Sequence, residues 1–280
     1  MNENTIDCPL CGSEVETAII VLNSFLSTEG EHELKSCKSC GFAFRVQLPN
    51  QSSKDVDMNK LGLVYGDYTA GTDTINERMM KRVKNIAKLY GPEPRLLDVG
   101  CGSGQLIQFA NDNGWQACGT ELNGQSTDER IFPVDICTAD LPGHSRASFD
   151  LVHCHHVLEH VSDPKAFLIA LASYVKPGGY LCVEVPNELE SLASQIKRLL
   201  GKKYNGATAY FEHLNFFSPT TFQYLMGALP GFDTTYLRTP FIGYGYSFAH
   251  AFFDRFQVLI SKGAVIEFLT QKEFELDGEK

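Results

Sequence analysis

The chain has 280 residues, of which 43% are hydrophobic and 21% charged, so its composition is that of a globular protein and excludes global disorder. Its formal net charge of −10 argues against binding nucleic acid through bulk electrostatics. No apolar run is long enough for a membrane span, which takes about 18 residues. Residues 1–9 carry acidic side chains and no basic ones ahead of an apolar stretch, so we expect no secretory signal peptide.

Two cysteine pairs stand near the N-terminus, Cys8 with Cys11 and Cys37 with Cys40, and a glycine follows each pair. The two-residue gap lets both thiolates of a pair face one metal, and four thiolates suit tetrahedral zinc. We therefore predict a structural zinc ribbon over residues 1–48, with strands between the two pairs; a redox pair is the alternative. Nine cysteines in all, five of them scattered, indicate reduced thiols and a cytoplasmic location.

The rest of the chain predicts a linker followed by alternating strands and helices. Residues 49–73 are rich in Ser, Asn, Asp and Lys, which is typical of a linker. A domain over residues 74–270 follows, with short apolar strands of the kind found in a sheet covered on both faces. We expect strands at 95–99, 116–122, 131–139, 149–154, 180–185, 232–238 and within 255–268. We expect helices at 74–90, 104–112, 164–175 and 219–229, and an acidic tail at 271–280. The fold class is therefore α/β, a doubly wound Rossmann-like sheet with a small N-terminal zinc ribbon.

A glycine-rich turn joins the first predicted strand of this domain to a helix. It reads Asp98-Val-Gly100-Cys-Gly102-Ser-Gly104, and its glycines permit a close backbone approach to a nucleotide-like ligand. Glu121 ends the second strand, where an acid can hold both ribose hydroxyls. A nicotinamide cofactor is the rival ligand, but it usually takes the spacing G-x-G-x-x-G, which is missing here.

Five segments together resemble the class I S-adenosylmethionine-dependent methyltransferases. They are LLDVGCGSG, GTEL, ADLP, FDLVHCHHVLEHVSDP and VKPGGYLCVEVPN, and the resemblance covers residues 74 to about 186. The resemblance implies that Gly100, Gly102 and Gly104 lie under the methionine and ribose of the donor. It further implies that Asp98 lies near the amino group, that Glu121 binds the ribose, that Asp140 and Leu141 flank the adenine, and that His155 lies near the donor.

Most methyl acceptors must lose a proton, so a general base is expected. His153, His155 and His156 cluster after the fourth strand, and His160 follows them. A second candidate is the pair Glu212-His213, which precedes a helix opened by Ser218 and Pro219. Histidine has a suitable pKa for a base at neutral pH. The alternative is that His213 only packs before the helix.

A narrower resemblance is to the deoxysugar C-methyltransferases. It rests on the CPxCG and CxxCG pairs, the segment Tyr65-Gly-Asp-Tyr68, the methyltransferase core and the EH-x-x-x-FS segment. It implies that Tyr68 and the Glu212-His213 pair act in deprotonating a ketosugar carbon. The aromatic segment 241–253 either lines a pocket for a planar or sugar acceptor or forms a core or subunit contact.

The sequence thus predicts a methyltransferase of a small molecule or a sugar or glycan precursor, with S-adenosylmethionine and zinc as cofactors. One alternative is an RNA methyltransferase whose ribbon holds RNA through basic residues such as Lys35, Lys38 and Arg45. The net acidity makes nucleic acid a poor partner. A second alternative is a binding protein that keeps the cofactor fold without turnover. The sequence leaves the oligomeric state and the acceptor atom open.

Overall fold

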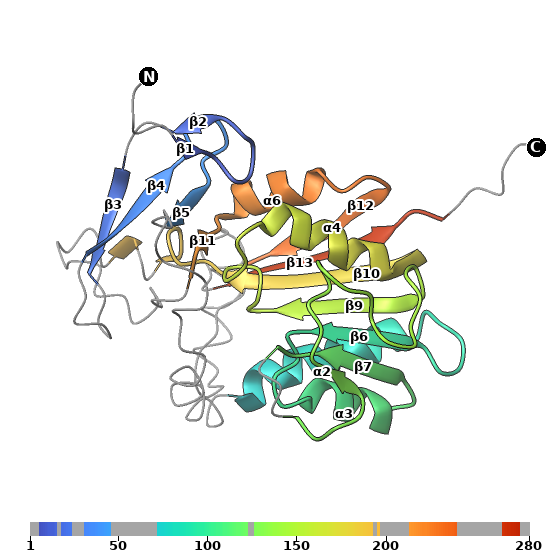
Figure 1. Ribbon diagram of the computed structural model, residues 1–280. Helices are drawn as coiled ribbons and strands as arrows, with labels where there is room; N and C mark the ends of the chain where they lie inside the picture. The colour runs from blue at the N-terminus through green and yellow to red at the C-terminus, as the bar shows by residue number, and fades with distance from the viewer. Residues whose placement is uncertain are drawn as a thin grey trace, which may run out of the picture.

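A seven-stranded sheet in the order β12-β13-β10-β9-β6-β7-β8 forms the centre of the protein (Figure 1). This computed structural model describes residues 6–15, 18–23, 31–45, 72–122, 126–192, 195–196, 213–239 and 265–274. Five strands run parallel: β6 (Arg95–Val99), β7 (Gln116–Thr120), β8 (Ile131–Phe132), β9 (Phe149–His155) and β10 (Val175–Pro186). Two more, β12 (Phe232–Arg238) and β13 (Val265–Lys272), are antiparallel, and β13 lies between β10 and β12.

Helices cover both faces of this sheet. Helices α2 (Thr72–Ala87) and α3 (Gln105–Asp112) share one buried cluster with Leu96 of β6. Helices α4 (Pro164–Tyr174) and α6 (Pro219–Gly227) share another with Leu97 of β6. Leu96 and Leu97, adjacent in one strand, are therefore buried in two different cores on opposite faces of the sheet. This confirms the predicted doubly wound sheet and explains its continuous apolar strands.

The predicted helix starts at Asp163 and Ser218 are confirmed. The Asp163 carboxylate accepts a hydrogen bond from the Ala166 N–H at 2.8 Å, and Pro164 occupies the first turn. The Ser218 hydroxyl accepts from the Thr221 N–H at 3.2 Å, while the Thr221 hydroxyl accepts from the Ser218 N–H at 2.8 Å, a reciprocal cap.

The third predicted strand is much shorter than residues 131–139. Only Ile131–Phe132 pairs with β7, because Pro133 has no N–H to continue the ladder. A turn follows, in which the Asp135 carbonyl accepts hydrogen bonds from the N–H groups of Thr138 and Ala139, both at 3.0 Å.

The last strand lies further along the chain than predicted. It runs from Val265 to Lys272, so it includes the first residues of the segment 271–280 that we predicted as a tail. Residues 275–280 lie outside the described part of the chain. Hydrogen bonds hold the end of the strand, since the Gln271 amide donates to the Gly178 carbonyl at 2.9 Å.

The N-terminal cysteine segment forms two small sheets. Strands β1 (Ile6–Asp7) and β2 (Glu14–Val15) pair with each other, and β3 (Ala18–Asn23), β4 (Glu31–Ser36) and β5 (Ala43–Arg45) form the second sheet. Its fourth strand is β11 (Asn215–Phe216), which comes from far along the chain and pairs with β5. The rings of Phe42 and Phe217 lie 5.3 Å apart, so the N-terminal segment shares its core with the larger domain.

The predicted linker falls mostly on residues outside the described part, and its last two residues, Thr72 and Asp73, belong to α2. Among the described residues, none of the helices has the length and apolar character needed to cross a membrane.

Candidate functional site

The strand order reverses direction between β6 and β9, which are neighbours in the sheet. In open α/β sheets, ligands bind in the crevice outside the carboxyl ends of the strands at this reversal. The glycine turn follows β6 and the histidine-rich segment follows β9, so both sequence signals lie at this crevice.

The three glycines of the turn differ in what surrounds their Cα atoms. All have positive φ: 72° at Gly100, 54° at Gly102 and 79° at Gly104. A Cβ on Gly100 would lie 2.2 Å from Val157 Cγ2, and one on Gly104 would lie 2.7 Å from Ile131 Cδ1. A Cβ on Gly102 would meet none of the described residues within 4 Å. Gly100 and Gly104 therefore allow close packing, while Gly102 faces the open space that a ligand needs.

Glu121, which directly follows β7, lies beside this open glycine. Its Oε2 accepts a hydrogen bond from the Gly102 N–H at 3.0 Å. The acid predicted to hold ribose hydroxyls is thus fixed next to the backbone predicted to lie under the donor. The residues present suit a nucleoside ligand at this position.

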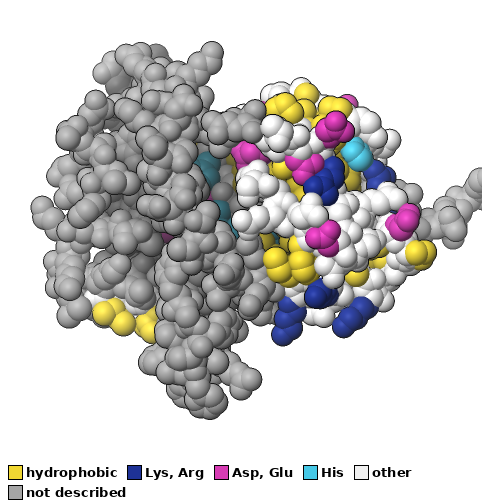
Figure 2. Space-filling model, turned by 90° about the horizontal axis from the view of Figure 1, so that it is seen from below, with side chains coloured by type: hydrophobic (Ala, Val, Ile, Leu, Met, Phe, Trp, Pro, Cys, Tyr) yellow, Lys and Arg dark blue, Asp and Glu magenta, His cyan; other side chains and the backbone are white. Residues whose placement is uncertain are grey.

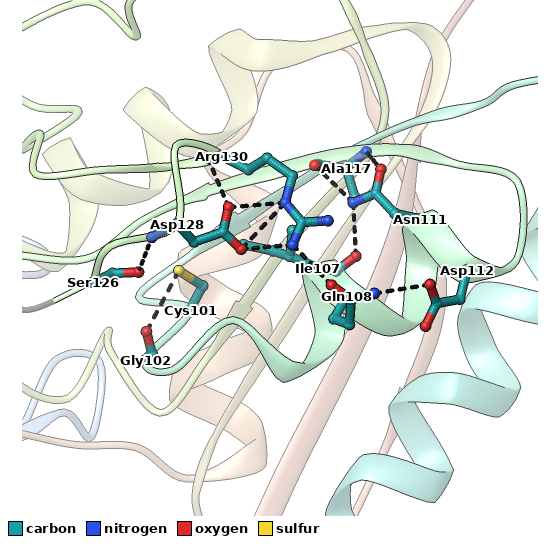
Figure 3. Close-up of polar contacts among 10 residues, drawn as sticks. All are labelled: Cys101, Gly102, Ile107, Gln108, Asn111, Asp112, Ala117, Ser126, Asp128 and Arg130. Carbon is teal, nitrogen blue, oxygen red and sulfur yellow. Dashed lines mark hydrogen bonds and ion pairs between the residues drawn. The ribbon is translucent and has the colours of Figure 1, made fainter.

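Side chains anchor the segments around the turn (Figure 3). Arg130 binds the Asp128 carboxylate through Nε at 2.9 Å and also donates to Gln108 Oε1 of α3 at 2.8 Å. Hydrogen bonds from Arg130 lower the pKa of Asp128 to about 2. The Asn111 amide donates to the carbonyls of Ile107 at 2.8 Å and Ala117 at 3.0 Å, which ties α3 to β7.

Asp98 is buried near the end of β6 and contacts His153, a pairing that the sequence did not predict. His153 Nδ1 lies 2.7 Å from Asp98 Oδ1, and both side chains are almost fully buried. The predicted place of Asp98 beside the donor's amino group stays a prediction, and the structure adds that His153 of β9 holds its carboxylate.

Asp140 and Leu141 occupy very different environments. Asp140 is exposed and binds Arg146, with Arg146 Nε donating to its Oδ1 at 2.9 Å. Leu141 is buried, and its N–H donates to the Tyr174 hydroxyl at 3.0 Å. Their predicted contacts with adenine stay predictions.

The histidines after β9 pair with carboxylates that the sequence analysis did not single out. His155 Nε2 lies 2.9 Å from Glu184 Oε1 of β10, and His156 Nδ1 lies 3.0 Å from Glu159 Oε1. Burial lowers the pKa of His155 to about 4. Burial opposes charge on His156 too, but the hydrogen bond and charge of Glu159 outweigh it and raise the pKa of His156 above its ordinary value. His155 is thus neutral near pH 7, and the position predicted near the donor carries no charge.

His213 joins this group from another part of the chain. Its Nδ1 lies 3.0 Å from Glu188 Oε1, and both side chains are buried. Burial raises the pKa of Glu188 above its ordinary value. The neighbour predicted to orient His213, Glu212, lies outside the described residues, as do Tyr68 and the aromatic segment 241–253.

Backbone hydrogen bonds hold His213 against the segment after β9. The Glu159 carbonyl accepts from the N–H groups of Leu214 at 2.8 Å and Asn215 at 3.0 Å. The Asn215 amide donates to the carbonyls of Leu158 at 3.1 Å and Val161 at 2.7 Å. Glu159 and Glu188 are therefore the functional candidates missed from sequence. The available sequence signal was their position: Glu159 lies in the segment LEH, and Glu188 follows the fifth predicted strand.

The four N-terminal cysteines converge. Their sulfur atoms all lie within 4.8 Å of one another, with Cys8 and Cys40 at 3.7 Å and Cys11 and Cys37 at 3.5 Å. The two turns match, because Gly12 N–H donates to the Cys8 carbonyl and Gly41 N–H to the Cys37 carbonyl, each at 2.8 Å. Four sulfurs around one zinc at about 2.3 Å would be roughly this far apart, so the donor set suits the ion.

Comparisons with known proteins place this geometry in a family. The family model described as "Methyltransferase domain" matches residues 72–236, more than half of the chain. A ubiquinone biosynthesis O-methyltransferase from Xanthomonas euvesicatoria is 36% identical over 149 residues, covering 46% of this chain and 60% of that protein. One from Idiomarina loihiensis is 39% identical over 95 residues, covering 30% and 39%. The chain thus spans at most about 60% of the length of these relatives.

Two of the solved structures that the chain resembles are methyltransferases by name. An S-adenosylmethionine-dependent methyltransferase from Archaeoglobus fulgidus has a TM-score of 0.49 at 17% identity, covering 70% of this chain and 94% of its own. The 1,6-didemethyltoxoflavin-N1-methyltransferase from Burkholderia thailandensis, solved with S-adenosylhomocysteine, has a TM-score of 0.49 at 14% identity and covers 91% and 100%. Because both TM-scores are below 0.5, the assignment of the fold and family rests on the family match and the observed strand order. The chain belongs to the methyltransferase-domain family and has the class I S-adenosylmethionine-dependent methyltransferase fold.

Proposed function

We propose that the protein transfers a methyl group from S-adenosylmethionine to a small-molecule acceptor. The observation that carries this proposal is the open backbone of Gly102 beside Glu121 at the point where the strand order reverses. The family match over residues 72–236 supports it.

The protein's part in this chemistry is to position two molecules and to assist the loss of a proton. S-adenosylmethionine, when bound, supplies a methyl group whose C–S electron pair stays on sulfur while an acceptor lone pair forms the new bond and the acceptor loses its proton. Gly102 and Glu121 hold the donor side. The buried histidines exclude water from the acceptor side, and His213 promotes the loss of the acceptor's proton.

The acceptor in this proposal is a small molecule that is methylated on oxygen. Support comes from the curated relatives, which are O-methyltransferases of ubiquinone biosynthesis by name. On the described part of the face in Figure 2, acidic and basic side chains both occur without a continuous basic surface. A small acceptor can bind without a basic surface, whereas RNA binding relies on basic residues that contact its phosphates.

A sugar or glycan precursor is the second candidate acceptor. Its support is that β5 of the cysteine-bearing segment pairs with β11, only two residues after His213. The two features behind the resemblance to deoxysugar C-methyltransferases, the cysteine pairs and the histidine segment, thus form one piece of structure. Tyr68 and Glu212 are retained in this candidate as assisting residues.

We also propose one structural zinc ion on Cys8, Cys11, Cys37 and Cys40. The sulfur spacing and the matched glycine turns support it. Four thiolates leave no open position for catalysis, so the zinc cross-links the segment. The cytoplasmic location expected from the cysteines stays a prediction.

Calorimetry with S-adenosylhomocysteine tests the donor site directly, without knowledge of the acceptor. We expect a single site per chain. Donor consumption with a panel of catechols, phenols and nucleotide sugars then identifies the acceptor class. Absence of S-adenosylhomocysteine binding by the intact chain would overturn the proposed function.

A further inference from the structure

Three histidines surround one buried glutamate on the acceptor side of the crevice. Glu159 Oε1 lies 3.0 Å from His156 Nδ1 and 4.0 Å from His160 Nε2. Glu159, His160 and His213 each place one potential ligand atom within 4.8 Å of the other two. The ring centroids of His160 and His213 lie 4.7 Å apart, so two segments of the chain bring these histidines together.

One carboxylate oxygen of Glu159, at the centre of this cluster, makes no hydrogen bond with the described residues. Glu159 is fully buried, and its Oε2 has no hydrogen-bond partner among the described residues. A buried carboxylate oxygen without a partner is costly, so the site calls for a further ligand that satisfies this oxygen.

The chain holds these groups in place before any ligand arrives. The Glu159 carbonyl accepts hydrogen bonds from the backbone N–H groups of Leu214 and Asn215, which fixes His213 beside Glu159. The Glu188 carboxylate lies 3.0 Å from His213 Nδ1. In metal sites a ligating histidine usually holds a carboxylate with its other ring nitrogen, and this second carboxylate sets the ring's orientation.

We propose that Glu159, His160 and His213 bind a divalent transition-metal ion. Two imidazoles and one carboxylate form a ligand set typical of such ions, and it leaves coordination positions open for other oxygen ligands. This site is separate from the four cysteines, which carry only sulfur ligands and suit zinc.

The position of the site suggests what the open positions would bind. Val157, two residues before Glu159, packs against Gly100 of the donor turn. An ion at Glu159 would therefore lie close to the donor turn, where it could coordinate acceptor oxygens and so lower their pKa. His213 would then promote proton loss through the ion rather than by accepting the proton itself. This role rests on the methyltransferase function proposed above, whereas the metal site does not.

Titration with Mn2+ followed by electron paramagnetic resonance tests the site. Mn2+ favours oxygen and imidazole ligands over thiolates, so the cysteine site does not interfere. We expect one bound Mn2+ per chain whose spin-echo spectrum shows imidazole nitrogen. His160→Ala removes a partly exposed ligand and should weaken binding more than the roughly 10–100-fold typical of losing an outer-shell partner. Glu159→Gln, which keeps the side chain's shape, should do the same.

His144→Ala is the matched control, because His144 pairs with Arg95 and takes no part in the cluster. It should bind Mn2+ like the wild type. No bound Mn2+ in the wild type, or unchanged affinity in folded His160→Ala and Glu159→Gln proteins, would overturn the proposal. Calorimetry with S-adenosylhomocysteine on the same samples reports on the donor site alone, so failure of the metal site and failure of the proposed function are distinguishable.

Discussion

At the residue scale, the three glycines of the turn differ in what a side chain would meet. A Cβ on Gly100 or Gly104 would clash with Val157 or Ile131, so any substitution there disturbs packing. A Cβ on Gly102 would meet none of the described residues, so a substitution there acts on the space proposed for the ligand and on its own backbone, which has a φ of 54°. The two kinds of glycine can therefore be separated by experiment.

We expect Gly102→Asp to abolish binding of S-adenosylhomocysteine, because its side chain fills the ligand's space and its charge faces the ligand's carboxylate. Glu121→Ala should weaken binding by about 1–3 kcal/mol through lost hydrogen bonds. Calorimetry measures both. Gly114→Ala is the control, since Gly114 also has a positive φ, of 84°, and none of the described residues lies within 4 Å of its Cβ position. Unchanged affinity in both site variants would contradict the assignment.

His155 should make the protein's stability depend on pH. Its pKa is lowered to about 4 by burial and by the charges of His156 and His153, partly offset by Glu184 of β10, from an ordinary value of 6.5. The unfolded chain then binds more protons between these two pH values, so stability falls as pH drops from about 6.5 towards 4. We expect this histidine to account for up to about 3 kcal/mol of that loss.

Urea denaturation of wild type and His155→Gln at several pH values measures this effect. The variant should lose less stability than the wild type between pH 6.5 and 4, whatever its stability at neutral pH. Equal losses in the two proteins would show that His155 does not titrate as its environment indicates.

In the proposed function, the acceptor chemistry depends most on His213. His213→Ala should lower kcat about 10²–10⁴-fold, the usual contribution of assisted proton transfer. S-adenosylhomocysteine affinity should stay unchanged, because the residue lies on the acceptor side. Glu188→Gln should cost less, since Glu188 only positions the imidazole. Full turnover in His213→Ala would move the search to His153, His155 and His156.

At the element scale, β11 connects the cysteine segment to the candidate site. Asn215 and Phe216 pair with Phe44 and Ala43 of β5, and the Arg45 N–H donates to the Leu214 carbonyl at 2.8 Å. Cys37 lies between β4 and β5, so the zinc proposed there would hold β5 in place. Because β5 pairs with β11, the zinc would also stabilise β11. The cysteine segment thus contacts the chain directly beside His213.

Cys37→Ser should therefore release the zinc and lower turnover, while S-adenosylhomocysteine still binds at the distant glycine turn. Metal binding is coupled to folding in such segments, so hydrogen exchange should rise in residues 31–45 and 213–216. Cys137→Ser, at an exposed cysteine outside the segment, is the control. Full zinc content in Cys37→Ser, or no zinc in the purified wild type, would contradict this prediction.

At the scale of the whole molecule, a buried arginine joins α2 to two neighbouring strands of the sheet, β10 and β13. Arg82 Nη1 donates to Cys182 Sγ of β10 at 2.8 Å, and its guanidinium pairs with Glu267 of β13. Both charged side chains are largely buried. The first helix of the domain and its last strand are thereby linked across the sheet.

Arg82→Met should cost about 3–5 kcal/mol, because it leaves Glu267 buried without its partner. The double variant Arg82→Met with Glu267→Gln should recover part of this loss. Trp115, the only tryptophan, is buried in the cluster that contains α2 and reports unfolding by its fluorescence. A single variant as stable as the wild type would show that the pair contributes little.

The sequence by itself determined the features whose chemistry lies in neighbouring residues. The glycine turn, the caps at Asp163 and Ser218 and the paired cysteine turns are each encoded within a few positions, and the structure shows each of them. The doubly wound sheet followed from the alternation of apolar strands and helices. Strand ends were less certain because Pro133 and the pairing of β13 with β10 override local propensity.

Only the tertiary structure decided which side chains meet across the crevice. His213 lies against Glu188 and Glu159, His153 against Asp98, and β11 against β5, although these partners are separated by 25 to about 170 positions. A histidine's spacing along the chain says which face it occupies, but its partner depends on which strands become neighbours and where the connecting segments return. The glycine turn could therefore be predicted from sequence, because its residues are neighbours in the chain, whereas the cluster of histidines and carboxylates around His213 is assembled from three separate segments.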